Sequence, residues 1–121
     1  MKQNCGAVLF MDVYLPIKEN KDFRRIYARG KSLVSPVMVT YVSKNRSQNV
    51  RIGITTSKKI GNAVKRNRSR RVIREAFRSL APRVTPGFDF IFVARGKTPF
   101  VKSTDVCRAM IQQFKNAGVL K

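Results

Sequence analysis

The sequence predicts a single-domain α+β fold with elements in the order α-β-β-α-β-α. Three stretches carry apolar residues three and four positions apart, which is typical of amphipathic helices. Three others are rich in β-branched or aromatic residues, which favours strands. A length of 121 residues with 43% hydrophobic content suffices for one small core, so disorder and a second domain are excluded.

The N-terminal residues lack a periodic pattern. We assign residues 1–16 to an arm whose order the sequence does not define, with Met11 as an alternative start, and residues 17–121 to the domain. No apolar run approaches the roughly 18 residues of a membrane helix, so we expect no membrane contact and a cytoplasmic protein. Cys5 and Cys107 match neither a metal-binding spacing nor a disulfide framework, so we expect reduced thiols.

A short first helix is predicted over residues 20–29. Asn20 is a favourable N-cap, and Gly30 suits the position after the last helical turn. Between these ends, Phe23 and Ile26 are spaced to share one face of the helix.

A β-hairpin is predicted next, with strands over residues 36–43 and 50–57 and a polar turn over residues 44–49. Alternation divides the second strand into two faces, one apolar and one carrying Arg51, Gly53 and Thr55. We therefore expect one buried face and one face open to a ligand.

The second half of the chain predicts a helix over 62–80, a strand over 88–94 and a helix over 103–117. The long helix has an apolar arc and an arginine-rich arc, and a proline follows its end. The strand is apolar at nearly every position, which places it inside the sheet. Ser103 is a candidate N-cap for the last helix, and Gly118 suits its end.

Charge and missing residue types limit the chemistry. Lys and Arg total 26 against 6 Asp and Glu, a net charge of +20 that indicates a polyanionic partner. The chain has no histidine, and only Glu19 and Asp22 among its acids lie within one helical turn. Acid–base catalysis and a protein-borne two-metal site therefore lack their usual side chains. We expect no catalytic, cofactor-binding or metal-binding residue on this chain.

The strongest functional signal is the cationic segment over residues 57–75. Like charges this close repel one another unless an anion relieves them, and Glu75 is the only acid in the segment. Arginine, with its planar fork, binds phosphate bidentately and stacks on bases. The segment therefore predicts RNA or DNA binding through its cations, Lys58, Lys59, Lys65, Arg66, Arg68, Arg70, Arg71 and Arg74.

Three aromatic residues near basic groups are candidates for stacking on unpaired bases. Phe23 and Tyr27 lie one turn apart on the first helix, and Tyr41 lies on the first hairpin strand. An ordinary core role fits these residue types equally well.

The run SKKIGNAVKRNRSRRVIRE, preceded by GITT, resembles the signature segment of the protein subunit of bacterial ribonuclease P. The similarity includes the Arg-Asn-Arg core at residues 66–68 and extends over roughly residues 17–115. It implies an α/β sandwich with a left-handed βαβ crossover, as in a domain of a ribosomal protein. That handedness departs from the usual right-handed rule.

The resemblance also implies a function. In that family an RNA subunit is the catalyst and uses Mg²⁺ to remove the 5′ leader of precursor tRNA, while the protein binds both RNAs. It implies ribonuclease P RNA and precursor tRNA as partners and no small-molecule substrate. By position, Asn67 and the cations of this segment would face the catalytic RNA and the substrate, and Phe23, Tyr27 and Tyr41 would line the leader-binding cleft.

Two other functions share these features. A ribosomal protein or assembly factor would have the same charge and size but would not stimulate precursor cleavage. An autonomous basic nuclease would cleave RNA without an RNA subunit, against which the missing histidines and sparse acids already count.

Overall fold

The computed structural model describes residues 14–121, and the predictions for residues 1–13, including Cys5 and Met11, lie outside that range. The described chain forms one five-stranded sheet with three α-helices. In chain order the elements are β1 (Leu15–Pro16), α1 (Asn20–Arg29), β2 (Lys31–Val34), β3 (Met38–Lys44), β4 (Arg51–Thr55), α2 (Ala63–Leu80), β5 (Phe88–Ala94) and α3 (Ser103–Ala117). Three short 3-10 helices, η1 (Lys58–Ile60), η2 (Ala81–Arg83) and η3 (Thr98–Phe100), complete the chain.

The sheet has the strand order β1-β4-β5-β3-β2, so the predicted hairpin is wrong. β5 lies between the two strands expected to pair, antiparallel to β3 and parallel to β4. The connecting loop crosses the start of β5, where the Asn45 amide donates to the Gly87 carbonyl and the Gly87 amide donates to the Asn49 carbonyl. β4, α2 and β5 thus form a βαβ unit, and β5 occupies the centre of the sheet as its apolar sequence predicts.

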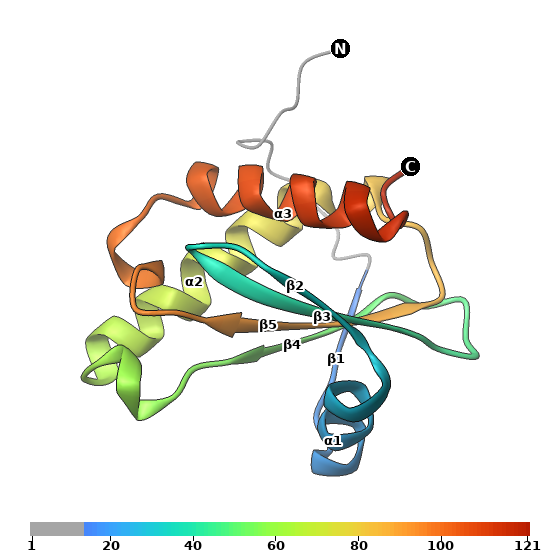
Figure 1. The fold of residues 1–121 in the computed structure, drawn as a ribbon, viewed down its shortest axis with the longest axis horizontal. Coiled ribbons are helices and arrows are strands. Elements are labelled where there is room, and N and C mark those ends of the chain that lie inside the picture. The colour runs from blue at the N-terminus through green and yellow to red at the C-terminus, as the bar shows by residue number, and fades with distance from the viewer. Residues whose placement is uncertain (1–13) are drawn as a thin grey trace.

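Helices cover both faces of the sheet, with α2 and α3 on one side and α1 on the other (Figure 1). The main core lies under α2 and α3, where four rings pack together: Phe77, Phe90, Phe92 and Phe114. Under α1 the buried set is small and consists of Ile17, Ile26 and Ile91. The face carrying Gly53 is therefore not fully open, since α1 crosses it and buries Gly53.

Two edge strands were missed, each for a physical reason. β1 has only two residues and pairs in parallel with β4, which adds Leu15 and Pro16, assigned above to the arm, to the sheet. Tyr14 also packs edge-on against Phe77, with the ring centroids 5.1 Å apart. β2 pairs antiparallel with β3 at the other edge, and its short KSLV sequence buries only Leu33.

Helix ends differ from the predictions in detail. The N-cap of α1 is Glu19, not Asn20, and that of α3 is Lys102, whose backbone amide donates to the Asp105 carboxylate. Gly30 ends α1 in an extended conformation, whereas Gly118 has the predicted left-handed conformation with φ of 72°. Among the described helices, none is long and apolar enough to cross a membrane.

Candidate nucleic-acid interface

The cationic segment begins at a rigid turn between β4 and α2. The Ser57 hydroxyl accepts from the Lys59 amide, and the Asn62 side chain caps α2 by accepting from the Lys65 amide at 3.0 Å. Gly61, between them, has φ of 135° and ψ of −153°, a conformation open essentially only to glycine. These contacts fix the direction in which α2 leaves the sheet.

The structure brings the predicted cationic residues together on η1 and the first three turns of α2. The buried side of this part of α2 carries Ser69, Val72 and Ile73, so the charged side chains are left at the surface. In residues 14–121, no carboxylate lies within ion-pair distance of any of these cations. The segment is therefore a continuous positive surface without internal neutralisation.

Some of these side chains are held by neutral acceptors. The Arg66 guanidinium donates to the Gly61 carbonyl at 2.9 Å, and the Arg70 guanidinium donates to the Asn67 side-chain oxygen at 2.9 Å. Arg68 donates from Nε to the Pro99 carbonyl at 2.6 Å, which fastens α2 to η3. These bonds orient the guanidinium groups without cancelling their charge.

Phe100 is a surface residue that sequence reasoning missed. Its side chain is 70% exposed, and the Lys65 ammonium lies 5.3 Å from the ring centroid. The turn that carries it is firmly held, because the buried Thr98 hydroxyl bonds to the Val37 carbonyl and the Arg95 amide. No periodic pattern marks a lone phenylalanine in a 3-10 turn, so nothing in the sequence singles it out.

The predicted aromatic residues form one cluster between α1 and the sheet. The rings of Tyr27 and Tyr41 meet edge to face with centroids 4.8 Å apart, and Phe23 lies 6.5 Å from Tyr27. The Tyr27 hydroxyl shares a 3.0 Å hydrogen bond with Thr55, the last residue of β4. Because η1 starts three residues later, the aromatic cluster lies beside the start of the cationic segment.

The three rings are neither fully buried nor fully exposed. Phe23 and Tyr41 are half-buried against the small core under α1, while Tyr27 is 37% exposed. Phe23 covers Gly53 so closely that a Cβ atom there would lie 2.7 Å from the tip of the ring. The cluster is thus anchored on its inner side and presents ring surface on its outer side.

Some acids that lie far apart in the sequence are brought together in the fold. Asp89, whose side chain is 1% exposed, accepts two bonds from the Arg51 guanidinium, at 2.8 and 2.7 Å. Arg25 bridges Asp89 and Asp22, and Asn45 donates to Asp89 at 2.8 Å. The hydrogen bond to Asp89 raises the pKa of Arg51, because the bond favours the charged guanidinium.

Asp22 and Asp89 are the acids of this network, and both are paired with arginines. In residues 14–121, no group of three or more Asp, Glu, His or Cys side chains comes together. Cys107 is a buried thiol in the main core.

The fold and these surfaces define a small, strongly basic α+β domain with aromatic rings beside an unneutralised helix. Comparison with known proteins places it more closely. The family model for ribonuclease P matches residues 11–118, and the chain belongs to this family.

Curated relatives cover most of the chain. A ribonuclease P protein component from Clostridium botulinum is 39% identical over 104 residues, covering 85% of this chain and 94% of that protein. One from Listeria welshimeri is 40% identical over 106 residues, covering 87% and 89%.

Solved structures agree in fold. A ribonuclease P protein from Staphylococcus aureus superposes with a TM-score of 0.77 at 34% identity, covering 88% of this chain and 97% of that chain. The protein from Thermotoga maritima gives 0.74 at 30% identity, covering 84% and 96%.

Proposed function

We propose that this chain is the protein subunit of ribonuclease P and assists the removal of the 5′ leader from precursor tRNA in the cytoplasm. The observation that carries the proposal is the continuous positive surface of η1 and α2, in a chain whose family relatives are named as ribonuclease P protein components. A ribonucleoprotein role fits a chain without histidine, because the RNA subunit then supplies the chemistry.

In this proposal the cationic segment neutralises phosphates of the catalytic RNA and of the substrate near the cleavage site. Phosphates that converge in a folded RNA repel one another, and each guanidinium bound there reduces that repulsion. Mg²⁺ ions held by the RNA subunit then bind at lower concentration. The protein itself holds no reacting atom and binds no cofactor.

Phe23, Tyr27 and Tyr41 receive the leader in this proposal. Their outer ring surface suits stacking with unpaired bases, worth about 1–3 kcal/mol per base. Mature tRNA has lost the leader, so stacking there favours substrate over product. Phe100, with Lys65 over its ring, adds a further aromatic surface beside the cationic segment.

The decisive experiment measures 5′ processing of a labelled precursor tRNA at low Mg²⁺. Its three arms contain this protein alone, a bacterial ribonuclease P RNA alone, and both together. Strong cleavage only in the mixture supports the proposal. If the protein gives no stimulation, a ribosomal-type RNA binder becomes the better assignment, and cleavage by the protein alone identifies an autonomous nuclease.

A variant pair at Tyr27 tests the leader contact. Tyr27→Ala removes an exposed ring, and we expect precursor affinity to fall about tenfold while mature tRNA affinity stays unchanged. Tyr27→Phe keeps the ring and loses only the bond to Thr55, so it serves as the matched control. Equal losses for precursor and mature tRNA would assign the ring a purely structural role.

A further inference from the structure

A basic pocket lies on the flank of α1 opposite the aromatic cluster. Its volume is about 720 Å³, and its lining comes from α1, the end of β3, the β3–β4 loop and the start of β4. Arg25 and Arg29 line it from α1, one turn apart, whereas Phe23 and Tyr27 occupy the opposite flank two positions away. The helix therefore separates this pocket from the aromatic cluster.

The pocket is polar and carries an excess of positive charge. Its cations are Arg25, Arg29, Lys44, Arg46 and Arg51, and Ser43, Asn45, Ser47 and Asn49 supply the remaining side chains. Asp89 and Asp22 neutralise only Arg51 and Arg25. In the described part of the chain, no carboxylate pairs with Arg29, Lys44 or Arg46.

The floor of the pocket is built rather than loose. The two bonds from Arg51 to the buried Asp89 fix that guanidinium, and Asn45 is held by Asp89 and by the Asn49 carbonyl. The Asn45 side chain in turn accepts from the Ser47 amide and hydroxyl, which gives the loop its shape. A fixed polar floor with three unneutralised cations around it suits a multiply charged anion.

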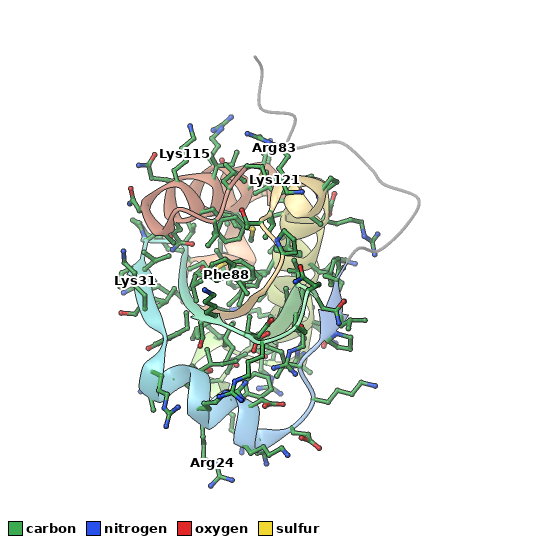
Figure 2. All side chains as sticks on the ribbon, turned by 90° about the vertical axis from the view of Figure 1, so that its right-hand side faces the viewer. Arg24, Lys31, Arg83, Phe88, Lys115 and Lys121 are labelled. Atoms are coloured by element: carbon green, nitrogen blue, oxygen red, sulfur yellow. The ribbon has the colours of Figure 1, made fainter. Side chains whose placement is uncertain are left out.

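We infer that this pocket binds internucleotide phosphates of RNA, at a site separate from the cationic segment of α2. The two sites lie at opposite ends of β4, since Arg51 at its start lines the pocket and the cationic segment follows its last residue, Thr55. Figure 2 looks onto the pocket's end of the molecule, with Phe88 marking the start of β5. The inference rests on the proposed function for the identity of the RNA.

Two stretches of RNA could supply the phosphates: the upstream part of a long leader, or the ribonuclease P RNA. The test removes the three unneutralised cations together, as Arg29→Gln, Lys44→Gln and Arg46→Gln. Binding is measured against ribonuclease P RNA alone, and, in the assembled holoenzyme, against precursor tRNA with a short and with a long leader. The salt dependence is recorded in each arm.

A control variant removes the same charge elsewhere, as Arg24→Gln, Lys31→Gln and Lys115→Gln. These three side chains are exposed and lie outside the pocket, with Arg24 pointing from α1 away from the sheet (Figure 2). Because both triple variants lose the same net charge, a difference in their RNA affinity reflects the position of the charges that were removed. Unfolding midpoints equal to that of the wild-type protein establish that the fold of both variants is intact.

We expect the pocket variant to lose about tenfold more affinity than the control, and its salt slope to fall by about two, as for three phosphate contacts on a single strand. A loss against ribonuclease P RNA identifies that source, and a loss confined to the long leader identifies the other. Losses equal to those of the control in every arm overturn the inference. If the wild-type protein fails to stimulate cleavage, the proposed function fails instead.

Discussion

Two groups of arginines in this chain have opposite surroundings. Arg51 and Arg25 share the carboxylates of Asp89 and Asp22, and the Arg51 side chain is only 26% exposed. Arg71 and Arg74 are exposed on α2, and no carboxylate in the described part of the chain pairs with them. The first pair holds β4, β5 and α1 together, whereas the second contributes repulsion to the folded chain.

The contrast teaches how a strongly basic protein divides its few acids. The sequence holds 6 acids against 26 cations, and two of those acids, Asp89 and Asp22, pair with Arg51 at the start of β4 and with Arg25 on α1. Removing a charge from the first group should therefore lower the unfolding free energy of the protein, whereas removing one from the second group should leave it unchanged or raise it. RNA affinity should fall when a charge of the second group is removed and change little when the first group is altered.

The largest effect is expected from Asp89→Asn. The change removes the charge of the buried Asp89 carboxylate and leaves Arg51 with only its 3.6 Å contact to Asp22, and breaking such a buried pair costs about 3 kcal/mol of unfolding free energy. Urea unfolding monitored by circular dichroism measures it. Glu19→Gln is the control, because the Glu19–Lys21 pair is well exposed and contributes under about 1 kcal/mol. Equal losses for the two variants would remove the distinction between the groups.

The next largest effect on stability is expected from Gly61→Ala, which alters the turn that sets the direction of α2 and so the position of Arg71 and Arg74. A Cβ atom at φ of 135° is strained and would also lie 2.7 Å from the Lys65 side chain, so we expect a loss of about 2 kcal/mol. RNA affinity should fall as well, because α2 begins here. Gly96→Ala has open space around its Cβ and should leave both quantities unchanged. A neutral Gly61→Ala would show that the turn does not need its glycine conformation.

A smaller effect on binding, and none on folding, is expected from Arg71→Gln. Losing one phosphate contact should lower affinity for ribonuclease P RNA about fivefold and reduce the salt slope by about 0.9, with unfolding free energy within about 0.5 kcal/mol of wild type. Arg68→Gln provides the comparison, because it also loses the bond to the Pro99 carbonyl and should destabilise the attachment of η3. If Arg71→Gln destabilises the fold as much as Arg68→Gln, Arg71 has a structural role.

Much of the architecture could be predicted from periodicity. The three helices and the central strand lie where their patterns indicate, because each buries a regular apolar stripe or run. The hairpin prediction was wrong because an alternating pattern indicates which residues of a strand are buried and not which strand pairs with it. β5 lies between the two strands, and Gly87 just before it is hydrogen-bonded to the β3–β4 loop. β1 was too short to carry a period.

In the candidate site, too, features that are local in the sequence could be predicted, whereas those that join separate elements could not. The cationic segment is contiguous in sequence, so its surface could be predicted from α2 alone. The Arg51–Asp89 pair and the pocket on the far flank of α1 join residues from separate elements, and no local spacing indicates them. Phe100 also needed the structure, because only its exposure beside Lys65 distinguishes it from a core ring.

A small effect on stability is also expected from Gly53→Ala, which tests whether the aromatic cluster, like Arg71 and Arg74, affects RNA binding more than folding. Alanine reduces the freedom of the unfolded chain, which stabilises by about 0.4–1 kcal/mol, but its Cβ displaces the Phe23 ring, so the two effects nearly cancel. Precursor affinity should nevertheless fall severalfold, because the displaced ring no longer meets the leader base.

A double-mutant cycle with Phe23→Ala separates these effects. Once the ring is absent, Gly53→Ala has nothing to displace, so it should stabilise the fold and cause no further loss of precursor affinity. Additive losses of precursor affinity would show that Gly53 acts without Phe23. If the ring of Phe23 can be displaced at nearly constant stability, the aromatic cluster resembles Arg71, because the position of its rings matters more for RNA binding than for folding.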